Sequence, residues 1–308
     1  MISIIVPCYK EESIINTFIN TLEQELNKLE DKFELIFVDN NSSDNTFELI
    51  KKSLSSKHKY KIIRFSNYFG KESAILSGLD NCTGESAIIM DPDLEDPPDL
   101  IPELIRKWRE GNDVVLTIRK AEELPVYKKV LKFFFYKVLV FSSNTHKKIP
   151  ANSGDFRIID KKIIGHIKSM RERTRFLRGL VNYIGYNQTH IDFERSFRKK
   201  GKSKSSINFL IKYGFDSLFS FSNVPISLIT KFGLILFIII VFFSIFLLIQ
   251  KFFGSDPIEG FTTVLLFMGL LSSFNILALG IVGEYISRIY SEVKKRPNYI
   301  IDKIEENN

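Results

Sequence analysis

The sequence predicts an α/β protein with a doubly wound, mostly parallel sheet, followed by two C-terminal helices that span a membrane. In the first part of the chain, short apolar segments alternate with amphipathic helical segments, which is the pattern of repeated βαβ units. Near the C-terminus, residues 232–249 and 261–282 contain no charged side chain. Each of these runs is long enough to cross a hydrocarbon core about 30 Å thick. We therefore expect a mixed α/β domain at 1–225, a membrane domain at 230–286 and a tail at 287–308.

Five apolar segments are expected as strands, at residues 2–6, 33–38, 60–65, 87–90 and 113–119. Helical periodicity predicts helices over residues 13–29 and 70–79, with a further helix between them that contains Phe47 and Ile50. Ser43 or Asp44 can cap that middle helix, because both residue types accept hydrogen bonds from exposed backbone N–H groups. Residues 151–160 are expected as a loop that enters a strand.

An acidic stretch follows the apolar run 87–90 and ends in two prolines. In an extended segment, Asp91 and Asp93 point to the same side, where their charges repel each other. A divalent cation removes that repulsion, and carboxylate oxygens suit Mg²⁺ or Mn²⁺. Glu95 could complete the metal shell directly or through water. The alternative is a solvated acidic turn, of which Asp96 would also be part.

Acidic side chains also follow two earlier strands. Ligands of open α/β sheets bind beyond the carboxyl ends of the strands, so Glu11 and Asp39 can accept hydrogen bonds from a nucleobase or a ribose. Helix capping is the alternative reading of such residues, and it is the role that we expect for Asp44. Lys71, in the segment Phe-Gly-Lys-Glu, can balance the charge of a phosphate or be an ordinary surface lysine.

Basic residues gather in the second half of the α/β domain. Arg119 ends the strand at 113–119, where its planar guanidinium could bind a diphosphate or a lipid phosphate; an ordinary surface arginine is the alternative. Residues 195–204 form a basic stretch with glycine and serine, which we interpret as a flexible loop over an anionic substrate rather than a merely solvated charge run. The stretches 124–141 and 207–221 are amphipathic and aromatic, which suits helices in a membrane interface. The first could equally be the core-facing helix of a soluble protein.

The charges that flank the two apolar runs predict a membrane topology. The linker 254–260 carries two carboxylates and no cation, whereas Lys231, Arg288 and Lys294 flank the other ends. By the positive-inside rule, both termini and the α/β domain are cytoplasmic. The only cysteines, Cys8 and Cys82, suit a reducing compartment. The first strand begins at Ile2, so no signal peptide is expected. We therefore expect a multi-pass protein of a bacterial inner membrane.

Several classes of function are disfavoured. No G-x-G-x-x-G motif follows the first strand, which argues against a dinucleotide dehydrogenase. The net charge of +7 is modest, and no RNA-binding or zinc-finger motif accompanies it, so we expect no nucleic-acid partner. A Gln-x-x-Arg-Trp motif is absent, and Trp108 is the only tryptophan, which disfavours a processive polysaccharide synthase.

Seven segments together carry a resemblance to a known family. They are 4–12 (IIVPCYKEE), 38–46 (VDNNSSDNT), 67–72 (NYFGKE), 90–98 (MDPDLEDPP), 154–157 (GDFR), 175–179 (RFLRG) and 201–204 (GKSK). The chain resembles the GT-A-fold glycosyltransferases of family 2, and more narrowly the polyprenyl-phosphate glycosyltransferases. Two departures stand out. The family usually has Asp-Asp-Gly-Ser where this chain has Asp39-Asn40-Asn41-Ser42, which could alter the base or ribose contacts. It usually has glutamine at the position of Glu95, where this chain adds a carboxylate beside the metal.

The resemblance implies different roles for different candidate residues. It implies metal-assisted chemistry with Mg²⁺ or Mn²⁺ at Asp91, Asp93 and Glu95, and places Asp155 near the reaction centre beside Asp93. We favour an orienting role for Asp155 over that of a general base. Binding of the nucleotide sugar is expected from Pro7, Tyr9, Glu11, Asp39, Lys71 and Asp91. Binding of the acceptor phosphate is expected from Arg119, Arg175, Arg195, Arg198, Lys202 and Lys204. A homo-oligomer, in particular a tetramer, is also implied.

The leading hypothesis is therefore a metal-dependent, inverting transfer of a hexose from a nucleotide sugar, such as UDP-glucose, to undecaprenyl phosphate. A phosphate monoester is largely ionised near pH 7, so it is already a nucleophile. The alternatives among enzymes are a GDP-mannose-dependent mannose synthase and a transferase of an aminoarabinose-type sugar. The alternative outside enzymes is an accessory subunit of a lipid-sugar flippase.

Overall fold

The computed structural model describes residues 1–119, 153–170, 177–193, 224–252 and 260–307. The chain divides into two compact units. The sheet unit contains Met1–Val140, Asn144–Leu210 and Arg296–Asn308, and the helical unit contains Phe141–Ser143 and Ile211–Lys295. The amphipathic stretches 124–141 and 207–221 and the basic stretch 195–204 lie outside the described residues.

In the described part of the chain, the sheet unit is built on one eight-stranded sheet with the order β7-β5-β6-β4-β1-β2-β3-β8. Neighbouring strands are parallel except where β6 pairs with β4 and β5 and where β8 pairs with β3. The sheet is thus mostly parallel, as predicted. The bounds are β1 (Ile2–Cys8), β2 (Phe33–Asp39), β3 (Lys59–Phe65), β4 (Ser86–Ile89), β5 (Val114–Arg119), β6 (Ser153–Asp160), β7 (Gln188–Phe193) and β8 (Ile301–Glu306).

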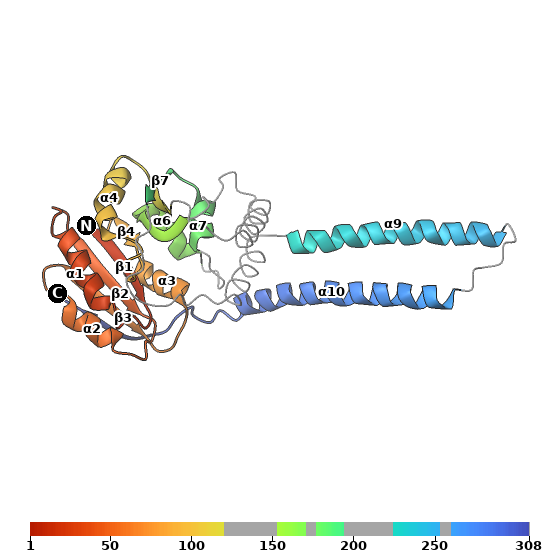
Figure 1. The fold of residues 1–308 in the computed structure, drawn as a ribbon, viewed down its shortest axis with the longest axis horizontal. Helices are drawn as coiled ribbons and strands as arrows, with labels where there is room; N and C mark the ends of the chain where they lie inside the picture. The colour runs from red at the N-terminus through yellow and green to blue at the C-terminus, as the bar shows by residue number, and fades with distance from the viewer. Residues whose placement is uncertain (120–152, 171–176, 194–223, 253–259, 308) are drawn as a thin grey trace. The chain divides into compact units, whose positions relative to one another are not determined.

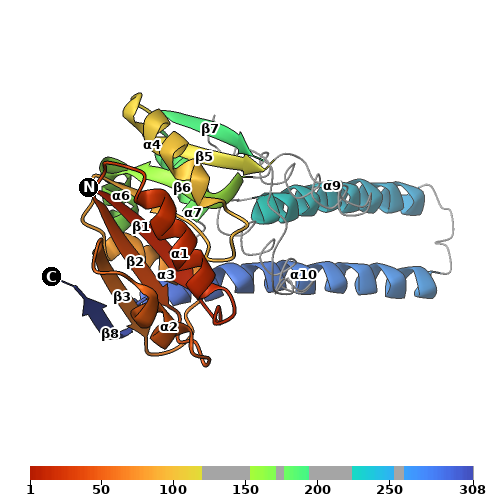
Figure 2. The same ribbon diagram turned by 60° about the vertical axis from the view of Figure 1, so that its left-hand side comes forward.

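Helices cover both faces of this sheet (Figures 1 and 2). Successive side chains of a strand point to opposite faces, so Ile4 and Val6 of β1 enter one core while Ile5 enters the other. The first core is completed by α1 (Ile15–Leu26), α2 (Thr46–Ser53) and α4 (Ile101–Arg109), which follows the short helix η1 (Pro98–Leu100). The second is completed by α3 (Lys71–Asn81), α6 (Lys161–Ser169) and α7 (Leu177–Ile184).

Gly78 fixes how closely α3 approaches the sheet. A Cβ atom at this position would lie 2.2 Å from Cγ2 of Ile5 in β1, which is far inside van der Waals contact. Only the absence of a side chain therefore permits the observed spacing. Because α3 begins at Lys71, this close approach also sets where the Lys71 side chain starts.

The last strand, β8, was not predicted from the sequence. It lies at the edge of the sheet and pairs antiparallel with β3, with Arg64 opposite Lys303 and Ile63 opposite Ile304. Residues 287–308 were expected as a tail, but 301–306 form part of the sheet. The sequence of β8, Ile-Asp-Lys-Ile-Glu-Glu, has too few apolar residues to indicate a strand. Strand β7 was missed as well.

The helical unit contains α9 (Val224–Phe252) and α10 (Phe261–Val293). The two helices contact each other through aromatic side chains, and the rings of Phe232 and Phe274 are 5.2 Å apart. In the described residues, one segment is long and apolar enough to cross a membrane, Phe267–Val293 in α10. Apolar side chains are exposed on both helices, for example Phe242 on α9 and Ile276 on α10.

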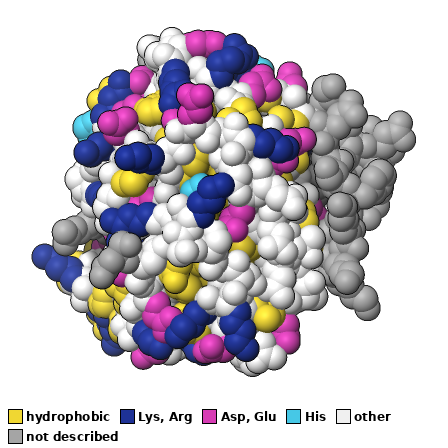
Figure 3. Space-filling view, turned by 90° about the vertical axis from the view of Figure 1, so that its left-hand side faces the viewer, with side chains coloured by type: hydrophobic (Ala, Val, Ile, Leu, Met, Phe, Trp, Pro, Cys, Tyr) yellow, Lys and Arg dark blue, Asp and Glu magenta, His cyan; other side chains and the backbone are white. Residues whose placement is uncertain are grey.

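One face of the molecule is shown in Figure 3. On this face, Lys and Arg side chains are interspersed with Asp and Glu side chains. The described side chains visible there therefore form no large patch of a single sign.

Candidate active site

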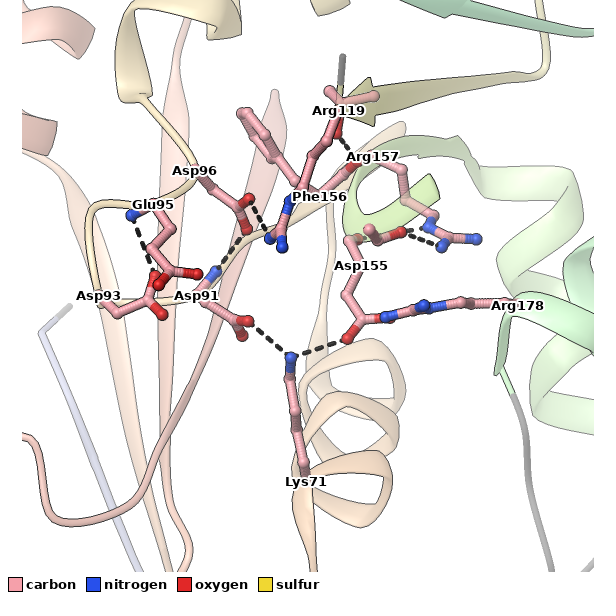
Figure 4. Close-up of polar contacts among 12 residues, drawn as sticks. Lys71, Asp91, Asp93, Glu95, Asp96, Arg119, Asp155, Phe156, Arg157 and Arg178 are labelled. Atoms are coloured by element: carbon pink, nitrogen blue, oxygen red, sulfur yellow. Dashed lines mark hydrogen bonds and ion pairs between the residues drawn. The ribbon is translucent and has the colours of Figure 1, made fainter. Parts of the chain in front are cut away.

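The carboxyl end of β4 meets the beginning of β6 because the two strands are antiparallel. Ile89 pairs with Arg157, and so the chain places Asp91, just beyond β4, near Asp155 at the start of β6. Strand β5 pairs with the other edge of β6, with Ile118 opposite Ser153, and its last residue is Arg119. Residues that are far apart in the sequence thus gather at one end of three neighbouring strands (Figure 4).

Lys71 lies between two of these carboxylates. Its Nζ is 2.7 Å from Oδ2 of Asp91 and 2.7 Å from Oδ2 of Asp155 (Figure 4). Partial burial would lower the pKa of Lys71, but the negative charges of Asp91 and Asp155 outweigh it and raise the pKa above its usual range. Lys71 is therefore a fixed positive charge at the site and not merely a surface lysine.

The carboxylate of Asp155 is held by cations from two helices, and its backbone is held by a buried arginine. Its second oxygen, Oδ1, accepts a hydrogen bond of 2.8 Å from Nε of Arg178 on α7. Arg157 is buried and donates to the backbone carbonyls of Asp155 and Gly154. Burial would raise the pKa of Asp155, but Lys71 and Arg178 hold it well below the usual range. A carboxylate with such a low pKa is a weak base.

Glu72 connects the same two helices. Its Oε2 accepts a hydrogen bond of 3.3 Å from the backbone N–H of Leu177, at the start of α7. Burial, reinforced by the negative charge of Asp155, raises the pKa of Glu72 to about 7. Glu72 therefore links α3 and α7 directly beside the residues that hold Asp155.

Asp96 and Arg119 form a second pair on the other side of Asp91. Asp96 is only 1% exposed, and its Oδ1 is 3.2 Å from NH2 of Arg119. Its Oδ2 faces the backbone N–H of Asp91 at 3.5 Å. Burial and then the charge of Asp91 raise the pKa of Asp96 to about 7, although Arg119 partly offsets the effect. Nε of Arg119 is buried without a hydrogen-bond partner among the described residues.

The carboxylates that were predicted to hold a metal ion lie on one short loop. Asp93 Oδ1 accepts a hydrogen bond of 3.1 Å from the backbone N–H of Glu95, and Leu94 between them has a positive φ of 59°. Within the described ranges, no three His, Cys, Asp or Glu side chains form a complete metal-binding group by themselves. The donor set of Asp91 and Asp93 still fits Mg²⁺ or Mn²⁺, since Mg²⁺ typically uses one or two carboxylates together with substrate phosphates. Participation of Glu95 stays a prediction.

The other predicted nucleotide-binding residues, apart from Lys71 and Asp91, lie at or near the ends of β1 and β2. Asp39 is fully buried, and its two oxygens accept from the Ser42 backbone N–H at 3.2 and 3.3 Å, with Nε of Arg64 3.6 Å away. Burial raises the pKa of Asp39, and the contacts with Ser42 and Arg64 offset this only in part. Asp39 is thus fixed by its own loop before any ligand arrives.

The loop after β1 is attached to the start of α2. The backbone N–H of Glu11 donates to Oγ1 of Thr46 at 2.9 Å, and Asp44 accepts from the Thr46 backbone N–H at 3.2 Å. The carboxylate of Asp44 therefore binds the first turn of α2, but the N-cap residue is Asn45 rather than Ser43 or Asp44, and its side chain makes no capping hydrogen bond. Pro7 is buried within β1. The Tyr9 ring lies 4.6 Å from the ring of the exposed Tyr68.

The structure thus brings together Lys71, Asp91, Asp155 and Arg119 from the predicted set. Five further candidates, Arg175, Arg195, Arg198, Lys202 and Lys204, lie outside the described residues. Sequence reasoning missed the positions of Arg178, Asp96 and Glu72. Arg178 stands in the same basic motif as Arg175, so the motif indicated the region but not which arginine contacts Asp155.

Comparison with known proteins assigns the family. Residues 3–168 match the model of glycosyl transferase family 2. An uncharacterized glycosyltransferase, YkcC, from Bacillus subtilis is 35% identical over 98% of this chain and 93% of its own length. The SfII prophage-derived bactoprenol glucosyl transferase of Shigella flexneri is 33% identical over 100% of this chain and 99% of its own.

A distant structural likeness accompanies these matches. Glucosyl-3-phosphoglycerate synthase from Mycobacterium tuberculosis, solved with Mn²⁺, UDP-glucose and phosphoglyceric acid, superposes with a TM-score of 0.46 and 16% identity. The superposition covers 71% of this chain and 79% of the synthase chain. The likeness is too distant to transfer any property to this protein. The family model covers more than half of the chain, and both relatives match the chain over more than nine-tenths of their length. The chain belongs to glycosyltransferase family 2 and is a glycosyltransferase.

Proposed function

We propose that this protein transfers a hexose from a nucleotide sugar, UDP-glucose or a similar donor, to a polyprenyl phosphate such as undecaprenyl phosphate. The observation that carries the proposal is the array Asp91–Lys71–Asp155–Arg178 at the end of the sheet. Alternating charges at fixed distances suit a reaction in which one phosphate group leaves and another attacks. A full-length relative named bactoprenol glucosyl transferase supports a polyprenyl phosphate as the acceptor.

In this proposal the cations bind the two phosphate-bearing substrates. Lys71 holds Asp91 and Asp155 in place and offers positive charge to the diphosphate of the donor. Arg119 offers a guanidinium, anchored by Asp96, to the acceptor phosphate. Preorganised charges of this kind stabilise the charge that develops in the transition state without the cost of reorganising solvent.

Asp155 positions these groups and does not remove a proton. Its low pKa makes it a weak base. The acceptor phosphate is largely ionised near pH 7 and needs no base. Attack of its oxygen on the anomeric carbon breaks the bond to the nucleoside diphosphate and inverts the configuration. The charge of Asp155 keeps Lys71 and Arg178 oriented towards the reacting groups.

A divalent cation at Asp91 and Asp93, with Glu95 nearby, would neutralise charge on the leaving diphosphate. The carboxylates of this chain would bind and orient that ion. The same loop places the backbone N–H of Asp91 against Asp96, so the position of Asp91 does not depend on the metal alone.

Chain connectivity supports a membrane hairpin. Strands β7 and β8 belong to one sheet and therefore lie on one side of the membrane. The chain that joins them must then return to the side from which it left. An even number of crossings is therefore needed. Helix α10 supplies one, and the uncharged run 232–249 in α9 supplies the other. We place both termini on the cytoplasmic face of a bacterial inner membrane, and include a homo-oligomer, such as a tetramer, in the proposal.

The experiment that tests this function uses the full-length protein in phospholipid vesicles. Labelled UDP-, GDP- and aminoarabinose-type sugar donors are supplied with Mg²⁺ and undecaprenyl phosphate, with unphosphorylated undecaprenol in the control. The proposal expects a lipid-linked sugar with at least one donor and none with undecaprenol. Absence of product with every donor would leave the accessory-subunit alternative.

A further inference from the structure

The segment that follows α10 contacts both β3 and α3, the two elements that flank the loop 66–70. The Tyr299 ring stacks on Phe65, the last residue of β3, with centroids 5.2 Å apart and planes inclined by 13°. The Tyr299 hydroxyl donates a hydrogen bond of 2.7 Å to Oδ2 of Asp80 in α3. The Tyr299 side chain therefore bridges β3 and α3. The loop between these two elements leads directly into Lys71, the first residue of α3.

A second series of contacts runs from the same ring towards the end of β2. Phe65 packs edge-on against Phe69, with ring centroids 5.7 Å apart. The backbone N–H of Phe69 donates a hydrogen bond of 2.8 Å to Oδ1 of Asn40, the residue after Asp39. The backbone of Ser66 is also fixed, because its N–H donates to the carbonyl of Ile300 at 3.0 Å.

These contacts end at or beside residues that the proposed function assigns to binding of the nucleotide-sugar donor. Asn40 adjoins the candidate nucleotide-binding residue Asp39, and Lys71 is the cation between Asp91 and Asp155. Stacked aromatic pairs and hydrogen bonds each contribute modestly, but together they fix a loop that has no other regular structure. Tyr299 lies six positions after Val293, the last residue of α10.

We infer that Tyr299 is a positioning residue for the nucleotide-sugar site. It acts through Phe65 and Asp80, which hold the loop between β3 and α3 so that Lys71 and Asp39, the neighbour of Asn40, lie in their binding positions. The segment that follows α10 is thereby connected to the donor site. This inference rests on the proposed donor class.

The test compares variants of the full-length protein. Tyr299→Leu removes the flat ring and the hydroxyl, and Tyr299→Phe removes only the hydroxyl. Glu305→Gln is the matched control, since it weakens the side-chain contacts of β8 with Lys51 on α2, at 2.9 Å, and with Lys303. The backbone pairing of Glu305 with Ile62 of β3 stays in place. Calorimetry measures binding of UDP and GDP with Mg²⁺, and kinetics measure KM for donor and acceptor separately.

We expect Tyr299→Leu to weaken nucleotide binding and raise the donor KM about tenfold, with the acceptor KM unchanged. Tyr299→Phe should weaken nucleotide binding about two- to threefold, and Glu305→Gln should match the wild type. Equal nucleotide affinity in Tyr299→Leu and wild type, an equal rise in both KM values, or an equal effect of Glu305→Gln would overturn the inference.

A thermodynamic cycle covers the case in which Tyr299→Leu does not fold. Tyr299→Phe and Asp80→Ala remove the same hydrogen bond, so their losses of nucleotide affinity should not add in the double variant. Additive losses, or none, would overturn the inference. Binding is measured without transfer, which separates the two proposals. A wild-type protein that binds a nucleotide but makes no lipid-linked sugar rejects the proposed reaction only, whereas binding of neither nucleotide rejects both.

Discussion

The ammonium group of Lys71 lies 2.7 Å from Oδ2 of Asp155, although 84 positions separate the two residues in the sequence. The same group is 2.7 Å from Asp91. One cation from the start of a helix thus joins carboxylates from two antiparallel strands. Because both carboxylates depend on it, Lys71 is the residue whose loss should disturb the site most.

Replacing Lys71 by methionine should reduce kcat by about 100-fold or more, since removal of a preorganised charge from an active site costs this much. It also leaves Asp91 and Asp155 without their shared partner. Steady-state rates of lipid-linked sugar formation measure the effect. Lys28→Met is the control, because Lys28 is exposed and its one ion pair with a described residue is with Glu25. Activity of Lys71→Met within threefold of the control would contradict this role.

Asp155→Asn separates an orienting role from that of a general base. We expect kcat to fall about 100-fold throughout pH 6–9, with the acidic limb of the pH–rate profile unmoved. The reason is that Lys71 and Arg178 hold the pKa of Asp155 well below its usual value of 3.8, outside this range. A variant whose rate no longer depends on pH along the acidic limb would identify Asp155 as the base instead.

The same carboxylate should stabilise the fold in a defined pH window. A pKa that is lowered in the folded state contributes stability above the unfolded value of 3.8, and this contribution is lost as the pH falls through the folded value. The stability difference between wild type and Asp155→Asn should therefore shrink as the pH falls below about 4. Denaturant unfolding across this range measures it, and a difference that grows on acidification would contradict the account.

Glu72 should have the opposite pH dependence. Its pKa rises from 4.5 to about 7 on folding, so its contribution to stability is complete below pH 4.5 and is lost as the pH rises towards 7. Glu72→Gln should therefore be more stable than wild type at pH 8, by on the order of 2 kcal/mol, and no more stable at pH 4.5. Unfolding midpoints at the two pH values decide this. A gain of equal size at both would show that charge is not the cause.

Gly78→Ala should destabilise the sheet unit by about 1–3 kcal/mol, as overpacking of a well-packed core does. The added Cβ would lie 2.2 Å from Ile5, so α3 must shift together with Lys71, and activity should fall as well. Gly165→Ala in α6 is the control, since its Cβ meets nothing within 4 Å. If the two alanine variants unfold at the same denaturant concentration, the proposed close contact does not constrain α3.

Much of the fold could be predicted because its elements follow local patterns. Strands β1, β2 and β4 are buried along their whole length, whereas β3 is buried only at Ile62, Ile63 and Phe65. The observed ends of all four strands lie within two residues of the predicted ones. The charged strand β8 could not be predicted, because its partner β3 is more than 200 positions away and only that pairing makes it a strand. The local sequence does not indicate a strand pairing between segments so far apart in the chain.

The candidate site was predictable in its parts but not in its connections. The spacing of Asp91 and Asp93 indicated an acidic site beyond β4, and Lys71 could be read either as a phosphate ligand or as a surface residue. The antiparallel register of β4 and β6 argues against an ordinary surface residue, because it carries Asp155 to Asp91 with Lys71 between them. Binding of a phosphate by Lys71 stays a prediction. The contact of Arg178 with Asp155 depends on how α7 packs, which no motif specifies.

The central claim is that the carboxylate and cation cluster beyond β4 transfers a sugar to a lipid phosphate. The most direct measurement is formation of hexosyl undecaprenyl phosphate by the wild-type protein and by Asp93→Asn, inserted at equal amounts in identical vesicles. The account predicts product from the wild type and none from the variant. No product from the wild type with any nucleotide sugar, or equal turnover by Asp93→Asn, would contradict it.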